Sequence, residues 1–208
     1  MKNFIFDLDG TLIDTMDMYL LPLQSVLAKH GYNITHEETK PLFGITAADA
    51  LGQIGVPEAD RQAIEDEWYK VVYAQNATIN TFDGVDDTLA QLNDADGVKL
   101  IVATSKVRDE YEAEFIPKFE IAKYFSGAVT ASDTKNHKPA PDPILAGIKE
   151  GNGIAEDSVY VGDTINDMRA AHAAGIKFAG AMWGAAMPER LADADYKLTH
   201  PSDLLKLL

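Results

Sequence analysis

Two carboxylate residues lie two positions apart near the start of the chain, and a pair at this spacing could carry out chemistry. Asp7 and Asp9 follow the apolar run 4–6, and Gly10 comes directly after them. The apolar run predicts a buried strand and the glycine predicts a turn, so both carboxylates are expected at the carboxyl end of that strand. Two carboxylates in apolar surroundings are costly unless a cation compensates their charge, and oxygen ligands favour a hard ion such as Mg2+. The alternative is an ordinary exposed turn.

Polar residues also follow two later apolar runs. Thr104 and Ser105 come directly after the strand-like run 98–103, and Asp163 follows the run 158–161. In a parallel sheet the carboxyl ends of the strands lie at one edge, and ligands bind there. We therefore expect these residues to lie near the opening pair of carboxylates.

A lysine and a further aspartate complete the set of candidate residues. Lys138 stands in the proline-rich segment 136–143, which is incompatible with a regular helix or a central strand and is expected to form a rigid turn. Asp167 follows Asp163 by about one helical turn. Asp163 could instead cap the helix that follows it, and Asp167 could be a carboxylate on the surface of that helix.

Together these residue types suit phosphoryl transfer through an aspartyl-phosphate. One carboxylate can attack phosphorus, and a second can protonate the leaving oxygen and then activate water. A cation screens the attacking carboxylate from an anionic substrate. Hydroxyls, backbone N–H groups and a lysine can bind the phosphoryl oxygens as charge develops. Each of these requirements has a candidate residue in the sequence.

The rest of the chain predicts an α/β fold with a helical insertion. After residue 84, strand-like runs alternate with helical patterns, which is typical of a parallel sheet with right-handed crossovers. Residues 15–80, in contrast, contain helical patterns and no strand-like run. We predict a Rossmann-like core domain of residues 1–15 and 81–208 with an α-helical cap subdomain of residues 16–80. Expected core elements include helices at about 107–115 and at 201–208, and a weak strand near 196–198.

Composition limits the classes of partner. The chain has 208 residues, 46% of them hydrophobic, and a formal net charge of −15. Because lysine and arginine form no stripe, nucleic acid and anionic membranes are not expected as partners. The absence of cysteine excludes disulfides and thiolate metal sites. With no run of about 18 apolar residues, we expect a soluble cytoplasmic protein. We expect it to be a monomer or a homodimer, and the residues suited to phosphoryl transfer indicate a small phosphate ester as its partner.

The sequence resembles the haloacid dehalogenase (HAD) superfamily, and within it the phosphoglycolate phosphatase-like group with an α-helical cap. Four motifs carry the resemblance, in the family's order. They are Asp-x-Asp-Gly-Thr-Leu-x-Asp-Thr at residues 7–15, a strand ending in Thr104, the lysine Lys138 before Pro-x-Pro-x-Pro, and Gly-Asp-Thr-x-x-Asp at residues 162–167.

The resemblance implies a role for each matching residue. Asp7 would be the nucleophile and a metal ligand, and Asp9 the general acid/base that binds the metal through its backbone carbonyl. Asp163 would be a further metal ligand. Thr104, Ser105 and Lys138 would hold the phosphoryl group, and Asp167 would support the site. The implied enzyme is a Mg2+-dependent phosphatase acting on a small metabolite such as phosphoglycolate or a sugar phosphate.

Two features of the sequence bear on the alternatives within the superfamily. Related sugar-phosphate mutases often carry an arginine shortly after the glycine of the cap loop, where this chain has Thr46 and Ala47. That difference weakens a β-phosphoglucomutase-like reading and leaves Thr46 as a candidate substrate contact. The dehalogenases lack an aspartate at the position of Asp9, so Asp9 argues for phosphate-ester hydrolysis. A binding or regulatory member without turnover is the remaining alternative.

The sequence leaves two residues near the motifs open. Lys106 follows Thr104 by two positions and could lie at the rim of the site or in solvent. Trp183 follows the strand predicted at 176–182 and could pack at the rim of the site or in the core.

Overall fold

The computed structural model describes residues 1–75 and 79–208. These residues divide into two compact units, one formed by Met1–Asp14 with Asn80–Leu208 and the other by Thr15–Ile79. Residues 76–78 of the predicted cap lie outside the described residues. None of the helices in the described part of the chain is long and apolar enough to cross a membrane.

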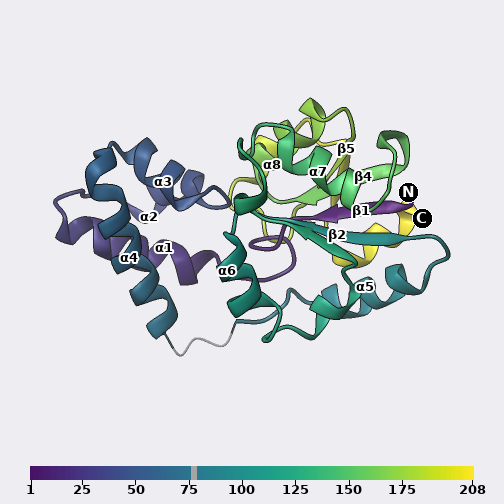
Figure 1. Cartoon of the computed structure of the whole chain (residues 1–208), viewed down its shortest axis with the longest axis horizontal. Coiled ribbons are helices and arrows are strands. Elements are labelled where there is room, and N and C mark those ends of the chain that lie inside the picture. The colour runs from purple at the N-terminus through teal and green to yellow at the C-terminus, as the bar shows by residue number, and fades with distance from the viewer. Residues whose placement is uncertain (76–78) are drawn as a thin grey trace. The chain divides into compact units, whose positions relative to one another are not determined.

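The first unit contains a six-stranded parallel sheet with the strand order β3-β2-β1-β4-β5-β6 (Figure 1). This arrangement confirms the predicted α/β fold, including the weak strand near 196–198. The strands are β1 (Asn3–Phe6), β2 (Lys99–Ala103), β3 (Gly127–Val129), β4 (Ser158–Gly162), β5 (Lys177–Ala181) and β6 (Tyr196–Leu198).

Alternating side chains of the strands build two apolar clusters, one on each face of the sheet. On one face, Phe4 and Phe6 pack with Leu89 of α5 (Val85–Asp94). On the other face, Ile5 packs with residues of α7 (Asp142–Glu150) and α8 (Ile165–Ala173). Figure 1 shows α5 on one side of the sheet and α7 with α8 on the other. Because both faces are covered, β1 is apolar throughout, as strands of parallel sheets usually are.

The strand order decides where the site can form. β1 pairs with β2 on one side and with β4 on the other, so the ends of these three strands are neighbours. The chain leaves β1 for β2 on one side and later enters β4 on the other, which makes the β1/β4 edge the point where the strand order reverses. Ligands of doubly wound sheets bind at this point.

The second unit is helical over its described residues. Its α-helices are α1 (Met16–Lys29), α2 (His36–Thr39), α3 (Ala47–Ile54) and α4 (Glu58–Ala74). They surround a separate apolar cluster that includes Leu23 and Trp68. The indole Nε1 of Trp68 donates to the backbone oxygen of Tyr19 at 2.9 Å, which ties α4 to α1.

Two predicted helices are present, in forms that the sequence did not specify. At 107–115, α6 (Arg108–Glu110) is followed by a π-helical turn at Tyr111–Phe115. The closing segment Pro201–Leu207 is a 3₁₀ helix. The spacing of apolar residues does not distinguish 3₁₀, α and π helices, because the span of their backbone hydrogen bonds differs by only one residue from one form to the next.

Candidate active site

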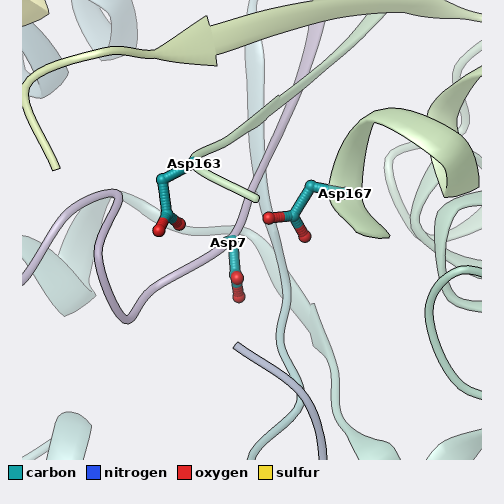
Figure 2. A group of neighbouring side chains, drawn as sticks. All are labelled: Asp7, Asp163 and Asp167. Carbon is teal, nitrogen blue, oxygen red and sulfur yellow. The ribbon is translucent and has the colours of Figure 1, made fainter. Parts of the chain in front are cut away.

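Three buried carboxylates converge at the carboxyl edge of the sheet (Figure 2). Asp7 follows β1, Asp163 follows β4, and Asp167 lies in the first turn of α8. Each offers an oxygen, and these oxygens all lie within 4.8 Å of one another. The side chains are no more than 2% exposed. The backbone N–H of Asp7 donates to Val161 O at 2.9 Å, so Asp7 extends the β1–β4 ladder by one residue.

The electrostatics of this cluster fit a cation. Asp163 Oδ2 is buried and accepts no hydrogen bond from the residues that the structure describes, whereas the buried Asp7 Oδ2 has the Lys138 ammonium as its ion-pair partner. Burial raises the pKa of Asp7 to about 7, although the Lys138 ammonium lowers it. Burial also raises the pKa of Asp163 well above its usual range, and the charges of Asp167 and Asp7 add to this effect. A divalent cation would supply further positive charge and would take oxygens of Asp7 and Asp163 as ligands.

Lys138 lies within the same cluster and is 5% exposed. Its Nζ lies 2.9 Å from Asp7 Oδ2 as an ion pair, and it donates a hydrogen bond to Asp167 Oδ1 at 2.8 Å. Burial opposes the charge, but the two carboxylates outweigh it and raise the pKa of Lys138. The lysine is therefore a fixed positive charge beside Asp7.

Asp167 has its oxygens already engaged. Oδ1 accepts from Lys138, while Oδ2 accepts from the backbone N–H of Thr164 at 2.9 Å and from the Thr164 hydroxyl at 2.6 Å. Thr164 and Asp167 form a capping box at the start of α8. These contacts leave Asp7 and Asp163 as the better-suited ligands and make Asp167 the anchor of Lys138.

Asp9 is not one of the three clustered carboxylates, and its side chain forms an ion pair with Lys106. Its Oδ2 lies 3.0 Å from Lys106 Nζ, and the same ammonium lies 2.9 Å from Glu110 Oε1. Lys106 is only 7% exposed, so of the two alternatives left open by the sequence it lies at the site and not in solvent. The sequence offered no clear signal for this position, because a charged pair four residues apart, such as Lys106 and Glu110, is also common on exposed surfaces.

The remaining predicted residues fall at two places. Thr104 is buried at the end of β2, where its Oγ1 accepts from the backbone N–H of Lys106 at 3.2 Å. Ser105 follows it and is partly buried. Thr46 belongs to the helical unit, where its hydroxyl accepts from Asp49 N at 3.2 Å and caps α3, as its sequence position indicated. A substrate contact by Thr46 stays a prediction.

A tight loop follows Asp9 and is fixed by residues that come after β4 and after β5. Thr11 Oγ1 donates to Asp163 Oδ1 at 2.9 Å, and the Trp183 indole donates to the backbone oxygen of Thr11 at 2.9 Å. Trp183 also packs against the apolar cluster of β1 and α5, so both alternatives for this residue describe part of its position. A Cβ at Gly184 would lie 1.8 Å from Gly10 O, so only glycine fits at this approach.

The fold and the site together define a doubly wound α/β protein with an acidic, lysine-containing site at its switch point. The chain belongs to the haloacid dehalogenase-like hydrolase family, whose model matches residues 4–181. The predicted superfamily is thereby confirmed.

Two curated relatives span nearly the whole chain. A phosphoglycolate phosphatase of Salmonella choleraesuis is 30% identical over 234 residues, covering 100% of this chain and 92% of the relative. Pyrophosphatase PpaX of Bacillus pumilus is 30% identical over 213 residues, covering 100% and 96%. The prediction of a phosphatase-type hydrolase is confirmed at this level.

Solved structures share the fold at lower identity. A hydrolase from Pseudomonas syringae has a TM-score of 0.86 at 22% identity, covering 99% of this chain and 97% of that one. The β-phosphoglucomutase of Clostridium difficile has a TM-score of 0.81 at 19% identity, covering 98% and 93%. At these identities the likeness concerns the fold alone.

Proposed function

We propose that this protein is a Mg2+-dependent phosphomonoesterase that acts on a small phosphorylated metabolite through an aspartyl-phosphate. The observation that carries the proposal is the arrangement around Asp7. Its buried carboxylate lies 2.9 Å from the Lys138 ammonium, and one of its oxygens lies within 4.8 Å of an oxygen of Asp163. Asp163 Oδ2 has no hydrogen-bond partner among the described residues. This arrangement combines a nucleophile, a positive charge and a place for a cation.

Each side chain of the site has its own role in the proposed reaction. Asp7 attacks phosphorus, and the resulting acyl phosphate is hydrolysed by water. Asp9 gives its proton to the leaving oxygen in the first step and takes a proton from water in the second. Lys138 and Thr104 bind the phosphoryl oxygens. When bound by Asp7 and Asp163, with the backbone carbonyl of Asp9 as the proposed third ligand, Mg2+ supplies positive charge that reduces repulsion between the nucleophile and the phosphoryl group.

The substrate class follows from charge and from the relatives. With a net charge of −15, the protein has to draw an anion with local positive charges, and the site supplies Lys106 and Lys138. The named relatives act on phosphoglycolate and pyrophosphate according to their names. We therefore propose phosphoglycolate or a sugar phosphate as the substrate, with pyrophosphate as a further compound to assay.

Asp7→Asn tests the proposal. The substitution keeps the shape of the side chain and removes its nucleophilic charge, so turnover of every ester in a Mg2+-supplemented panel should fall by at least about 1,000-fold. The melting temperature should be kept or raised, because a buried charge is removed. Asp94→Asn, at an exposed carboxylate on α5, is the matched control and should keep wild-type rates. Hydrolysis by Asp7→Asn at the wild-type rate would refute the mechanism.

The same assays separate the alternatives. A phosphomutase would convert a hexose 1-phosphate into its 6-phosphate faster than it releases inorganic phosphate. A binding or regulatory member would show no Mg2+-dependent hydrolysis across the panel. We expect release of inorganic phosphate to dominate, because Thr46 and Ala47 replace the arginine that related mutases often carry in the cap loop.

A further inference from the structure

One side chain that reaches the site comes from the interior of the sheet. Tyr160 lies in the middle of β4, and its ring is fully buried in the apolar cluster that also contains Ile5 and Phe178. A phenylalanine would fill the same apolar space. The hydroxyl is therefore the part of this residue that packing does not explain.

The Tyr160 hydroxyl has three polar neighbours. Lys138 Nζ donates to it at 3.1 Å. The hydroxyl lies 2.9 Å from the backbone oxygen of Ala103 and 3.2 Å from Asp167 Oδ1, and its single proton can serve only one of them fully. The shorter distance favours the Ala103 carbonyl, which leaves a lone pair of the phenol for the lysine. The phenol thus connects the ammonium group to the last residue of β2.

This contact is important because the backbone of Lys138 lies in a loop and its side chain is flexible. The residue stands in a loop, and its ammonium is carried on a flexible stem of four carbons. Nζ has three protons and three polar neighbours within 3.1 Å, namely Asp7, Asp167 and the Tyr160 hydroxyl. Asp7 is the proposed nucleophile, so it changes during the reaction. Asp167 is held at the start of α8, and Tyr160 is held in the centre of the sheet, so the hydroxyl is a fixed contact for the ammonium. Burial, with the charges of Asp167 and Asp7, raises the pKa of Tyr160 well above its usual range, so the hydroxyl keeps its proton.

We propose that Tyr160 is a positioning residue for the reaction: its hydroxyl orients the Lys138 ammonium so that one N–H faces the phosphoryl group on Asp7. This inference rests on the proposed phosphatase function. It assigns a chemical role to a strand residue that the sequence motifs do not include. The competing explanation is that the hydroxyl only satisfies the Ala103 carbonyl and Asp167 and contributes to stability alone.

Tyr160→Phe separates the two explanations, because it removes one oxygen and keeps the ring. Tyr196→Phe, on β6 of the same sheet, is the matched control that loses a hydroxyl away from the site. For Tyr160→Phe we expect kcat to fall about tenfold, the scale set by one hydrogen bond to a charged group, with KM and the Mg2+ concentration for half-maximal activity within twofold of wild type. Tyr196→Phe should keep the wild-type kcat. Melting temperatures, measured in parallel, fix an assay temperature at which both variants are folded.

A crystal structure of Tyr160→Phe gives a readout that does not depend on turnover. We expect Lys138 Nζ to move away from its position between Asp7 and Asp167. The inference is wrong if kcat stays within twofold of wild type, or if Nζ keeps its position in the variant whether or not an ester is hydrolysed. A wild-type protein that hydrolyses no ester would instead overturn the proposed function, and the crystal structures of the two proteins would still decide whether Tyr160 positions the lysine.

Discussion

Removing divalent cations should make the stability of this protein fall as the pH rises from about 5 to 8. Burial raises the pKa of Asp7 from 3.8 to about 7 when no cation is present. The folded state then keeps a proton that the unfolded chain releases from about pH 4 upward. Because the folded state binds more protons over this window, the free energy of unfolding decreases with rising pH. Asp163, whose pKa burial also raises, acts in the same direction.

The shift on Asp7 sets the size of the effect. Integrating the difference in bound protons between pH 5 and pH 8 for these two pKa values gives a loss of about 2–3 kcal/mol. For a chain of this length, that corresponds to a decrease in melting temperature of about 5–10 °C. A bound cation favours the ionised carboxylates, so added Mg2+ should stabilise the protein more at pH 8 than at pH 5. At 100 times its dissociation constant it would contribute about 2.7 kcal/mol.

Thermal unfolding in EDTA and in excess Mg2+, followed by circular dichroism from pH 5 to pH 8, measures this coupling. Asp7→Asn lacks the titrating group, so its melting temperature in EDTA should depend less on pH and its gain from Mg2+ should be smaller. Asp94→Asn should behave like wild type. A wild-type melting temperature in EDTA that rises from pH 5 to pH 8, or equal Mg2+ stabilisation of wild type and Asp7→Asn, would refute the reasoning.

Two further substitutions test the surroundings of the site. Lys106→Met removes the ammonium that lies 3.0 Å from Asp9 Oδ2, so kcat should fall about tenfold in steady-state assays. An unchanged kcat would show that Asp9 does not need this ion pair for the reaction. Gly184→Ala places a Cβ 1.8 Å from Gly10 O and forces the backbone to move, so the free energy of unfolding measured by calorimetry should fall by about 1–3 kcal/mol or more. A wild-type melting temperature would contradict the close approach of the two loops.

Local patterns in the sequence predicted much of the fold. The unbroken apolar stretch around Phe4 and the run 98–103 predicted strands, because strands covered on both faces are apolar at every position. The positions of Thr46 and of Gly84 also anticipated the starts of α3 and α5. The helices predicted at 107–115 and 201–208 are present, but their π and 3₁₀ forms were not predicted, since apolar spacing indicates a helix but not its hydrogen-bond pattern.

The surroundings of Asp9 show where sequence reasoning failed. The motif identified the carboxylate, but not that a buried Lys106–Glu110 pair lies against it. A charged pair four residues apart is common on exposed helix surfaces, so its spacing alone does not indicate burial. In the same way, Tyr160 could be recognised as a strand residue, but its hydroxyl gains a role only from the loop that brings Lys138 to it.

By itself the sequence determined the family, the order of the strands and helices along the chain, and the identity of the acidic and lysine residues at the strand ends. These properties depend on local composition and on motifs that are contiguous in the chain. Only the tertiary structure decided that Asp163 Oδ2 lacks a hydrogen-bond partner among the described residues and that Asp7 and Asp167 share Lys138. It also decided that Asp7 and Asp9 have different partners. Asp7 faces the Asp163 cluster and Asp9 faces Lys106 because β1 lies between β2 and β4, and strand order is a property of the assembled sheet.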